Sequence, residues 1–466
     1  MKNAIVQQMA VAPANRGLDW IKTSLQAAIE LELSTLPPYL CAMWSIRDSS
    51  NEPGKGAYTL IDSIVRQEMG HMGLVCNMLT AVGGRPQIAA GYAENVQYPG
   101  KLPGGVRQQL TVFLSGLTKP FVHDVLMQIE FPENEIVLLE ALAVHTFPTI
   151  GAFYDALSDA FTRVKPDIDK NKQLSSPAVG VKPLASLDDV HAAIALIKTQ
   201  GEGSSTSPAD GGPDDELAHY YRFAELYIGK KIVKTAGGFA FAGDPVPFPD
   251  TITVPPIPTG GFPGVSSEVG GLLASFDKLF SDMLDDLDTA WKNTNQASLG
   301  LAVGKMLQLR GAANNIMMKP LPKAVNGFYA PTFQYIPVSQ RTAAAPGGAQ
   351  APAAGGSPGA GPRFSDITNL LATLAGNDPN IGDAPHGAFW TDDYDTFIAQ
   401  KTDDWGVPGN LVVKGNPDQS VLLQALSGPF SGLPQMPDTD ADPKGRHATQ
   451  AELNLVSTWI TNGCPK

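Results

Sequence analysis

Residues 61–79 have the sequence IDSIVRQEMGHMGLVCNML, in which apolar side chains recur at the spacing of one helix face. We predict an amphipathic helix there. Glu68 and His71 are three residues apart within the apolar stripe, so both side chains leave the same face, about 5–6 Å apart at Cβ, and can reach one metal ion. A buried carboxylate is costly unless it has a hydrogen-bonded partner or a cation. The two residues are therefore a candidate metal-binding pair, and a pair satisfied within the core or by solvent is the alternative.

Two other segments carry carboxylates in apolar, helical surroundings. Glu216 and His219 form a second Glu-x-x-His at the start of a helix predicted over residues 214–226. Near the N-terminus, Glu30 and Glu32 lie within a third apolar segment, and the pattern does not decide between them. Two Glu-x-x-His helices with single glutamates from two others form the ligand set of carboxylate-bridged di-iron and di-manganese four-helix bundles. The sequence therefore predicts a mainly α, metal-binding bundle.

The composition limits the partners and the compartment. A chain of 466 residues exceeds a single typical core, so two or three domains are expected. The net charge of −13 disfavours nucleic acid and anionic membranes as partners. The three cysteines show no metal-type spacing, which favours a reducing compartment over a disulfide framework. Neither a signal peptide nor an apolar run of membrane-spanning length is evident, and we expect a soluble cytoplasmic protein.

Proline and glycine divide the rest of the chain. The helix predicted over residues 18–46 should end or bend near Pro37 and Pro38, because proline breaks a helix. The helix predicted over residues 187–200 runs into Glu202, which lies between two glycines. Such glycines let the backbone approach whatever the carboxylate binds, and a solvated glutamate after a helix end is the equal alternative. Further helical regions are predicted at residues 133–164, 272–291 and 299–317, the last two as a hairpin over the bundle.

An Ala/Pro/Gly stretch separates a C-terminal segment from the rest. Residues 342–362 cannot bury apolar surface and indicate a flexible linker. The predicted domains are therefore a metal-binding domain at residues 1–337, a linker at 338–362 and a small, mostly α domain at 363–466. Helices are expected in the last domain at residues 364–374 and 450–460, with a turn-rich middle and a segment at residues 420–426 between them.

The N-terminal domain resembles the ferritin-like domain of the iminophenyl-pyruvate dimer synthase family, known from bacterial bisindole pathways such as those to violacein and rebeccamycin. The matching pieces, in order, are residues 31–40, 67–72, 129–133, 151–154, 200–203 and 219–223. The resemblance implies a ferritin-like four-helix bundle with extra helices and loops. It also implies metal ligands at Glu32, Glu68, His71, Glu202 and His219, with Glu216 as a second choice beside His219.

One position departs from the family pattern. Where the family often has Gly-Glu-Phe-Tyr, this chain has Ala152 in place of the glutamate. The loss of a bridging carboxylate leaves a weaker second metal position, a single-metal site, or a site completed by Glu216 or Glu202. A donor set of carboxylates and imidazoles suits iron or manganese. We expect two iron ions, with one ion and manganese as the alternatives.

The C-terminal domain loosely resembles a cytochrome-c-like module at residues 413–423, 435–437 and 459–465. Met436 would be the axial ligand in a haem-bearing relative, but the chain has no Cys-x-x-Cys-His motif, and residues 383–390 stand where it would lie. We expect no haem here, and interpret residues 363–466 as a scaffold or a docking module for a protein partner.

The combined prediction is an oxidase or oxygenase that uses non-haem iron and O2 on a small amino-acid-derived or peptide metabolite in a biosynthetic pathway. The retained Glu and His residues favour it. A non-catalytic metalloprotein or binding module with a degenerate metal site is the alternative, which Ala152 favours.

Overall fold

The computed structural model describes most of the chain, namely residues 4–49, 51–132, 149–203, 207–209, 216–236, 238–322, 325–341, 362–376, 388–403, 407, 409–428, 430, 435–437 and 445–466. Residues 342–361 of the linker predicted at 338–362, and the 133–148 part of the helical region predicted at 133–164, lie outside these residues. The chain divides into two compact units, residues 1–299 with 313–344 and residues 300–312 with 345–466. Within the described ranges, no helix has both the length and the apolar character needed to cross a bilayer.

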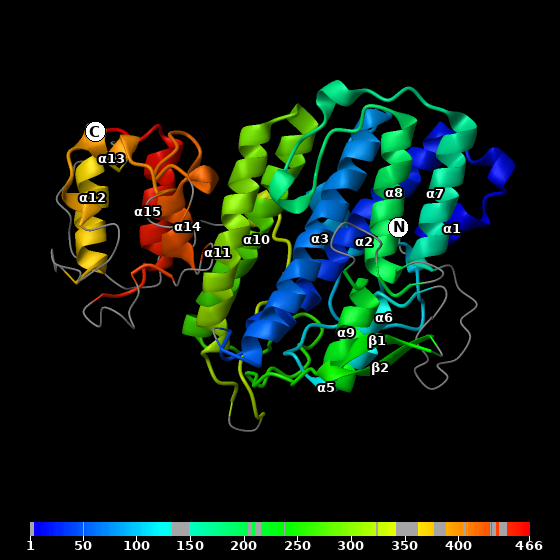
Figure 1. Cartoon of the computed structure of the whole chain (residues 1–466), viewed down its shortest axis with the longest axis horizontal. Helices are drawn as coiled ribbons and strands as arrows, with labels where there is room; N and C mark the ends of the chain where they lie inside the picture. Colours follow the sequence, from blue (N-terminus) through cyan, green and yellow to red (C-terminus); the bar gives the residue numbers. More distant parts are fainter. Residues whose placement is uncertain are drawn as a thin grey trace. The chain divides into compact units, whose positions relative to one another are not determined.

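A bundle of long helices forms the centre of the first unit (Figure 1). Its members are α2 (Leu18–Trp44), α3 (Gly54–Ala81), α7 (Ile150–Val164) and α8 (Leu187–Glu202). Local chemistry sets several of their ends. The hydroxyl of Thr149 accepts from the backbone N–H of Ala152 at the start of α7, and Ser186 caps α8 in the same way. The helix predicted around Glu68 is confirmed, and it ends just before Gly83, whose φ is +73°.

Of the two predicted outcomes at the prolines, a helix end is wrong, because α2 continues through Pro37 and Pro38 to Trp44, and a bend stays a prediction. Proline lacks the backbone N–H that would bond to the carbonyl four residues earlier. Ser34 is the residue four before Pro38, and its carbonyl accepts instead from the hydroxyl of Tyr98, at 2.6 Å. A side chain from another segment thus supplies a hydrogen bond that the helix itself cannot make.

Short elements gather at one end of the bundle (Figure 1). They are α5 (Lys119–Phe121), a π-helical turn (Val122–Leu126), α6 (Met127–Ile129), α9 (His219–Ile228) and the antiparallel strands β1 (Lys230–Thr235) and β2 (Gly238–Pro245). The first three form one continuous helical segment with a wide turn in its middle, a feature frequent at functional sites. Glu225 of α9 accepts from the backbone N–H of Ile232, at 2.7 Å, which ties β1 to α9.

A further layer covers α2. The helices predicted at residues 272–291 and 299–317 are confirmed as α10 (Ser267–Asn293) and α11 (Gln296–Met317). The layer over α2 consists of α4 (Ile88–Asn95) and α10. Aromatic contacts hold it. Trp44 of α2 stacks on Phe333 at 5.9 Å between ring centres, and Tyr92 of α4 meets Phe280 of α10 edge-on at 5.1 Å. The short N-terminal helix α1 (Ala4–Ala10) precedes the bundle.

Asp277 of α10 is a buried carboxyl that makes the unit sensitive to pH. Its oxygens accept from the Thr332 hydroxyl at 2.7 Å and from the backbone N–H of Gln334 at 2.9 Å. Burial raises its pKa to about 7, above that of an exposed aspartate. The folded state therefore binds this proton more tightly than the unfolded state, and the associated stability is lost as the pH rises from about 4 through about 7.

We expect Asp277→Asn to keep both contacts, because the amide can donate to the Thr332 hydroxyl and accept from Gln334. The variant has no proton to lose, so its stability relative to wild type should be greater at about pH 8 than at about pH 5. Urea unfolding of both proteins at the two pH values measures this difference. The same difference in stability between variant and wild type at both pH values would contradict the prediction.

The second unit contains α12 (Phe364–Leu374), α13 (Tyr394–Ala399), α14 (Val421–Ser427) and α15 (Gln450–Thr461). The helices predicted at residues 364–374 and 450–460 are confirmed, and α14 covers most of the segment at residues 420–426. Their apolar faces form one core that includes Ile367, Phe397, Leu422 and Trp459. Thr449 caps α15 in a reciprocal arrangement with Glu452.

Candidate metal centre

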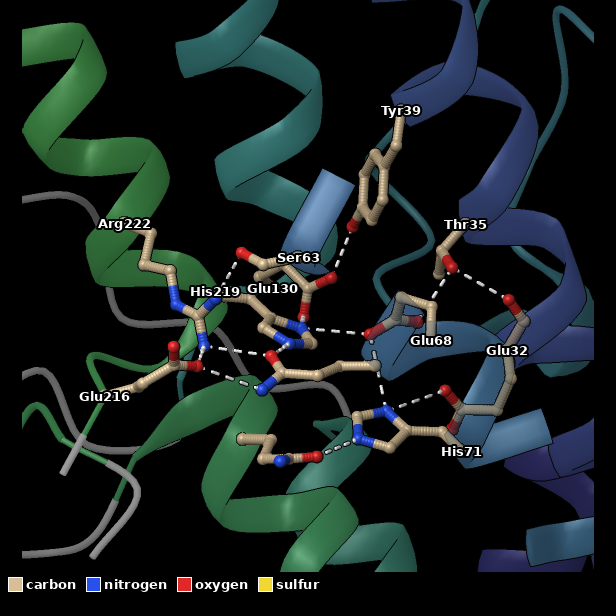
Figure 2. A network of polar contacts seen from close by, with 12 residues as sticks. Glu32, Thr35, Tyr39, Ser63, Glu68, His71, Glu130, Glu216, His219 and Arg222 are labelled. Atoms are coloured by element: carbon tan, nitrogen blue, oxygen red, sulfur yellow. Dashed lines mark hydrogen bonds and ion pairs between the residues drawn. The ribbon is translucent and has the colours of Figure 1, made fainter. Parts of the chain in front are cut away.

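The first candidate group of ligands comes from the two long helices α2 and α3. Glu32, Glu68 and His71 are buried, and one ligand atom of each lies within 4.8 Å of the other two. Nδ1 of His71 is 3.4 Å from Oε1 of Glu68 and 3.7 Å from Oε2 of Glu32 (Figure 2). Glu30 points elsewhere on α2, since it accepts from Gln26.

The second group shares Glu68 with the first. Its other members are Glu130, which directly follows α6, and His219, which is the first residue of α9. Nδ1 of His219 is 2.9 Å from Oε1 of Glu68 and 3.6 Å from Oε2 of Glu130 (Figure 2). The backbone of Gly201 passes close by, because a Cβ there would lie 3.5 Å from Oε2 of Glu130. Two adjacent clusters with one common carboxylate are thus brought together.

The orientation of the His219 ring is set from outside the two groups. Arg222, which can only donate, is 2.9 Å from Oε1 of Gln67, and Nε2 of the Gln67 amide donates to Glu216 at 3.2 Å. Nε2 of His219 lies 2.9 Å from the same Gln67 oxygen and must therefore carry a hydrogen. In the neutral ring, Nδ1 then presents its lone pair to the carboxylates.

The His71 ring follows the same pattern. Its Nε2 is 2.7 Å from Oε1 of Gln200, so its Nδ1 also faces carboxylates. Nδ1 of His219 is buried and, among the described residues, has no partner in hydrogen-bonding geometry despite its short distance to Glu68. A lone pair that faces carboxylate oxygens is unfavourable unless a cation or a proton lies between them. The arrangement therefore fits metal ions, whose histidine ligands usually donate their other N–H to an oxygen.

Each carboxylate of the two groups also accepts a hydroxyl hydrogen bond. Tyr154 donates to Glu32, Tyr39 donates to Glu130, and Thr35 donates to Glu68 at 2.8 Å (Figure 2 shows the last two). Burial raises the pKa of both tyrosines well above its usual value, so their hydroxyls stay protonated and act as donors. These contacts orient the carboxylate oxygens.

The electrostatics favour added positive charge. Burial raises the pKa of Glu32 and of Glu130, and the negative charge of Glu68 adds to this effect. For Glu68, burial acts in the same direction but is outweighed by the two imidazoles, and its pKa falls. Burial alone would lower the pKa of His71 and His219, yet the carboxylates raise both. In the absence of metal, bound protons balance the negative charge of the three carboxylates, and metal cations can replace these protons.

Two predicted ligands lie outside both groups. The expectation that Glu216 and His219 share a helix is wrong, because α9 begins at His219 and residues 216–218 precede it. Glu216 is exposed and pairs with Arg222 at 2.9 Å. Glu202 is buried at the end of α8, where its Oε1 accepts from the backbone N–H of Gly151 at 2.7 Å. The N-terminus of α7 attracts that negative charge. As metal ligands, Glu202 and Glu216 stay predictions.

Sequence reasoning did not single out Glu130. It carries no Glu-x-x-His motif and stands at the end of a very short helix. The available signal was a lone carboxylate between Ile129 and Phe131, within a piece that matched the family. Ala152 lies at the start of α7, where its N–H donates to Thr149.

Comparison with known proteins agrees with the helical architecture. Residues 25–228 match a protein-family model described as Ferritin-like. The chain contains a ferritin-like domain. The prediction of a mainly α, ferritin-like bundle with extra helices is thereby confirmed. The chain is also similar to the crystal structure of a ferritin like protein from Caulobacter vibrioides, with 22% identity over 68% of this chain and 97% of that one and a TM-score of 0.47. A search of curated proteins with this chain found no match.

Proposed function

We propose that the ferritin-like domain is a non-haem di-iron oxidase or oxygenase that acts with O2 on a small amino-acid-derived or peptide metabolite. The observation that carries this proposal is the shared carboxylate Glu68, which stands between two buried groups that each present an imidazole Nδ1. Manganese suits the same donors. The resemblance to the iminophenyl-pyruvate dimer synthase family supports the class of substrate.

In this proposal Glu32, Glu68 and His71 hold one ion, and Glu68, Glu130 and His219 hold the other. The chemistry that two iron ions supply when bound is the activation of O2 with electrons from both. The protein contributes position and exclusion of water. Hydroxyls of Thr35, Tyr39 and Tyr154 hold the carboxylates, and the burial of all five ligand side chains keeps bulk water away.

The neighbours Glu30 and Glu32 of α2 provide the test. Both are buried, but only Glu32 belongs to a candidate metal group. We expect iron-loaded, reduced wild type to consume O2, Glu32→Gln to lose at least about 90% of this rate, and Glu30→Gln to retain it. An oxygen electrode measures the rates, and elemental analysis gives the iron content. Iron binding without O2 uptake under any reductant would favour the non-catalytic metalloprotein.

For the second unit we propose a haem-free module that docks a protein partner. The support is the loose resemblance to a cytochrome-c-like module without the haem attachment motif. Stoichiometric binding of a partner to residues 363–466, lost when they are deleted from the full chain, is the expected result.

A further inference from the structure

Arg107 occupies an unusual backbone conformation in the segment that leads to α5. It lies between α4 and α5 with a φ of +47°. Residues other than glycine rarely adopt this backbone conformation, because it costs free energy. Such strain persists where the surroundings require a side chain to point in a given direction. The residue is half-buried, so the direction of its side chain has an electrostatic consequence.

The two side chains that the guanidinium is shown to contact are neutral. One Nη2–H donates to Oε1 of Gln128 at 2.7 Å, and Cζ lies 4.6 Å from the ring centre of Phe131. Among the described residues, Arg107 forms no ion pair. Burial lowers its pKa to about 10, while Tyr220 and the carboxylate of Glu202 act in the opposite direction. Withdrawing a cation from water without an adjacent anion is unfavourable.

The position of Arg107 links it to the candidate ligands. Its partners Gln128 and Phe131 stand on either side of Glu130 in the chain. The Phe131 ring packs edge-on against Tyr220 at 5.4 Å, and Tyr220 directly follows His219. The guanidinium therefore lies over an aromatic pair whose members adjoin two residues of the second candidate group.

We infer that Arg107 binds the carboxylate of the substrate and that Phe131 contacts the adjacent apolar part. A guanidinium presents five N–H donors in a fork that matches a carboxylate, and one of the five is taken by Gln128. The ligand class is thus a small carboxylic acid with an apolar side chain, such as an amino acid or a 2-oxo acid. This inference rests on the proposed function for the identity of the site as a substrate site.

A purely structural role for Arg107 predicts a different response to mutation. If Arg107 mainly holds its loop through Gln128 and Phe131, then Arg107→Met should lower the melting temperature. If it is a binding residue, Arg107→Met should leave the melting temperature of the ligand-free protein unchanged or higher, because a desolvated cation is removed. Methionine keeps an apolar contact with the Phe131 ring.

The binding test uses the full chain, with its metal content measured, and two probes of equal shape. Titration calorimetry compares 3-phenylpropionate with the neutral 3-phenylpropionamide. We expect wild type to bind the acid and discriminate against the amide, and Arg107→Gln to lose roughly 10- to 100-fold in affinity for the acid. Arg107→Lys should fall between them, because it keeps the charge but not the fork.

Two outcomes would overturn the inference. One is the absence of acid binding by wild type. The other is equal acid affinity in wild type and Arg107→Gln, which is the result expected if the acid binds the metal directly or if the arginine is structural. The metal content of Arg107→Gln should equal that of wild type. Because binding is measured without turnover, a failure of O2 uptake would remove the proposed function and leave the carboxylate site intact.

Discussion

Glu68→Ala is expected to reduce the bound iron from about two ions per chain to near zero. Glu68 is the only residue common to the two candidate groups within the part of the chain that the structure describes. Its removal leaves each group with one carboxylate and one imidazole, too few donors for tight binding of iron. Elemental analysis of iron and manganese on wild type and variant, purified side by side, measures the effect.

The stability of the metal-free protein distinguishes a lost ligand from a lost fold. Without metal, Glu68 is a buried carboxylate near Glu32 and Glu130, whose raised pKa values reflect its charge as well as burial. In the metal-free protein its replacement removes the repulsion of Glu32 and Glu130 but also the carboxylate that faces both imidazoles, so some loss of melting temperature is expected in the variant. Added metal should raise the melting temperature of the wild type only. A variant that keeps about two ions per chain would contradict the shared role of Glu68.

The part of the site that the sequence predicts is the part held by a regular helix. Glu68 and His71 are three residues apart in one long helix, and the structure places their side chains 3.4 Å apart. Spacing along a helix converts directly into distance in space. The mainly α fold follows in part for the same reason, since apolar periodicity is clear in long helices such as α3, α7 and α10.

The parts that could not be predicted depend on contacts between distant segments. Where α2 continues through Pro38, the carbonyl of Ser34 accepts from the hydroxyl of Tyr98, which lies 64 residues further along the chain. Glu130 reaches the centre because a π-helical turn and a very short helix present it, and neither has a sequence period. Glu202 lies between two glycines, but the group that its carboxylate approaches is the backbone N–H of Gly151 at the start of α7.

Glu130 and Glu202 therefore form the sharpest pair for mutation. Both are buried glutamates near the end of the bundle, and Gly201 adjoins both. The family resemblance favours Glu202 as a ligand, whereas the geometry groups Glu130 with Glu68 and His219. We expect Glu130→Gln to lose at least one of about two ions per chain. Glu202→Gln should keep both ions.

The two variants are matched in chemistry, because each exchanges a carboxylate for an amide of the same shape. In Glu202→Gln the new amide oxygen can still accept from the backbone N–H of Gly151, so little stability should be lost. In Glu130→Gln the amide oxygen can still accept from Tyr39, but the negative charge that faces His219 is removed. Metal titration of both proteins, with the melting temperature as a control, decides between the assignments. Loss of an ion in Glu202→Gln but not in Glu130→Gln would restore Glu202 as the ligand.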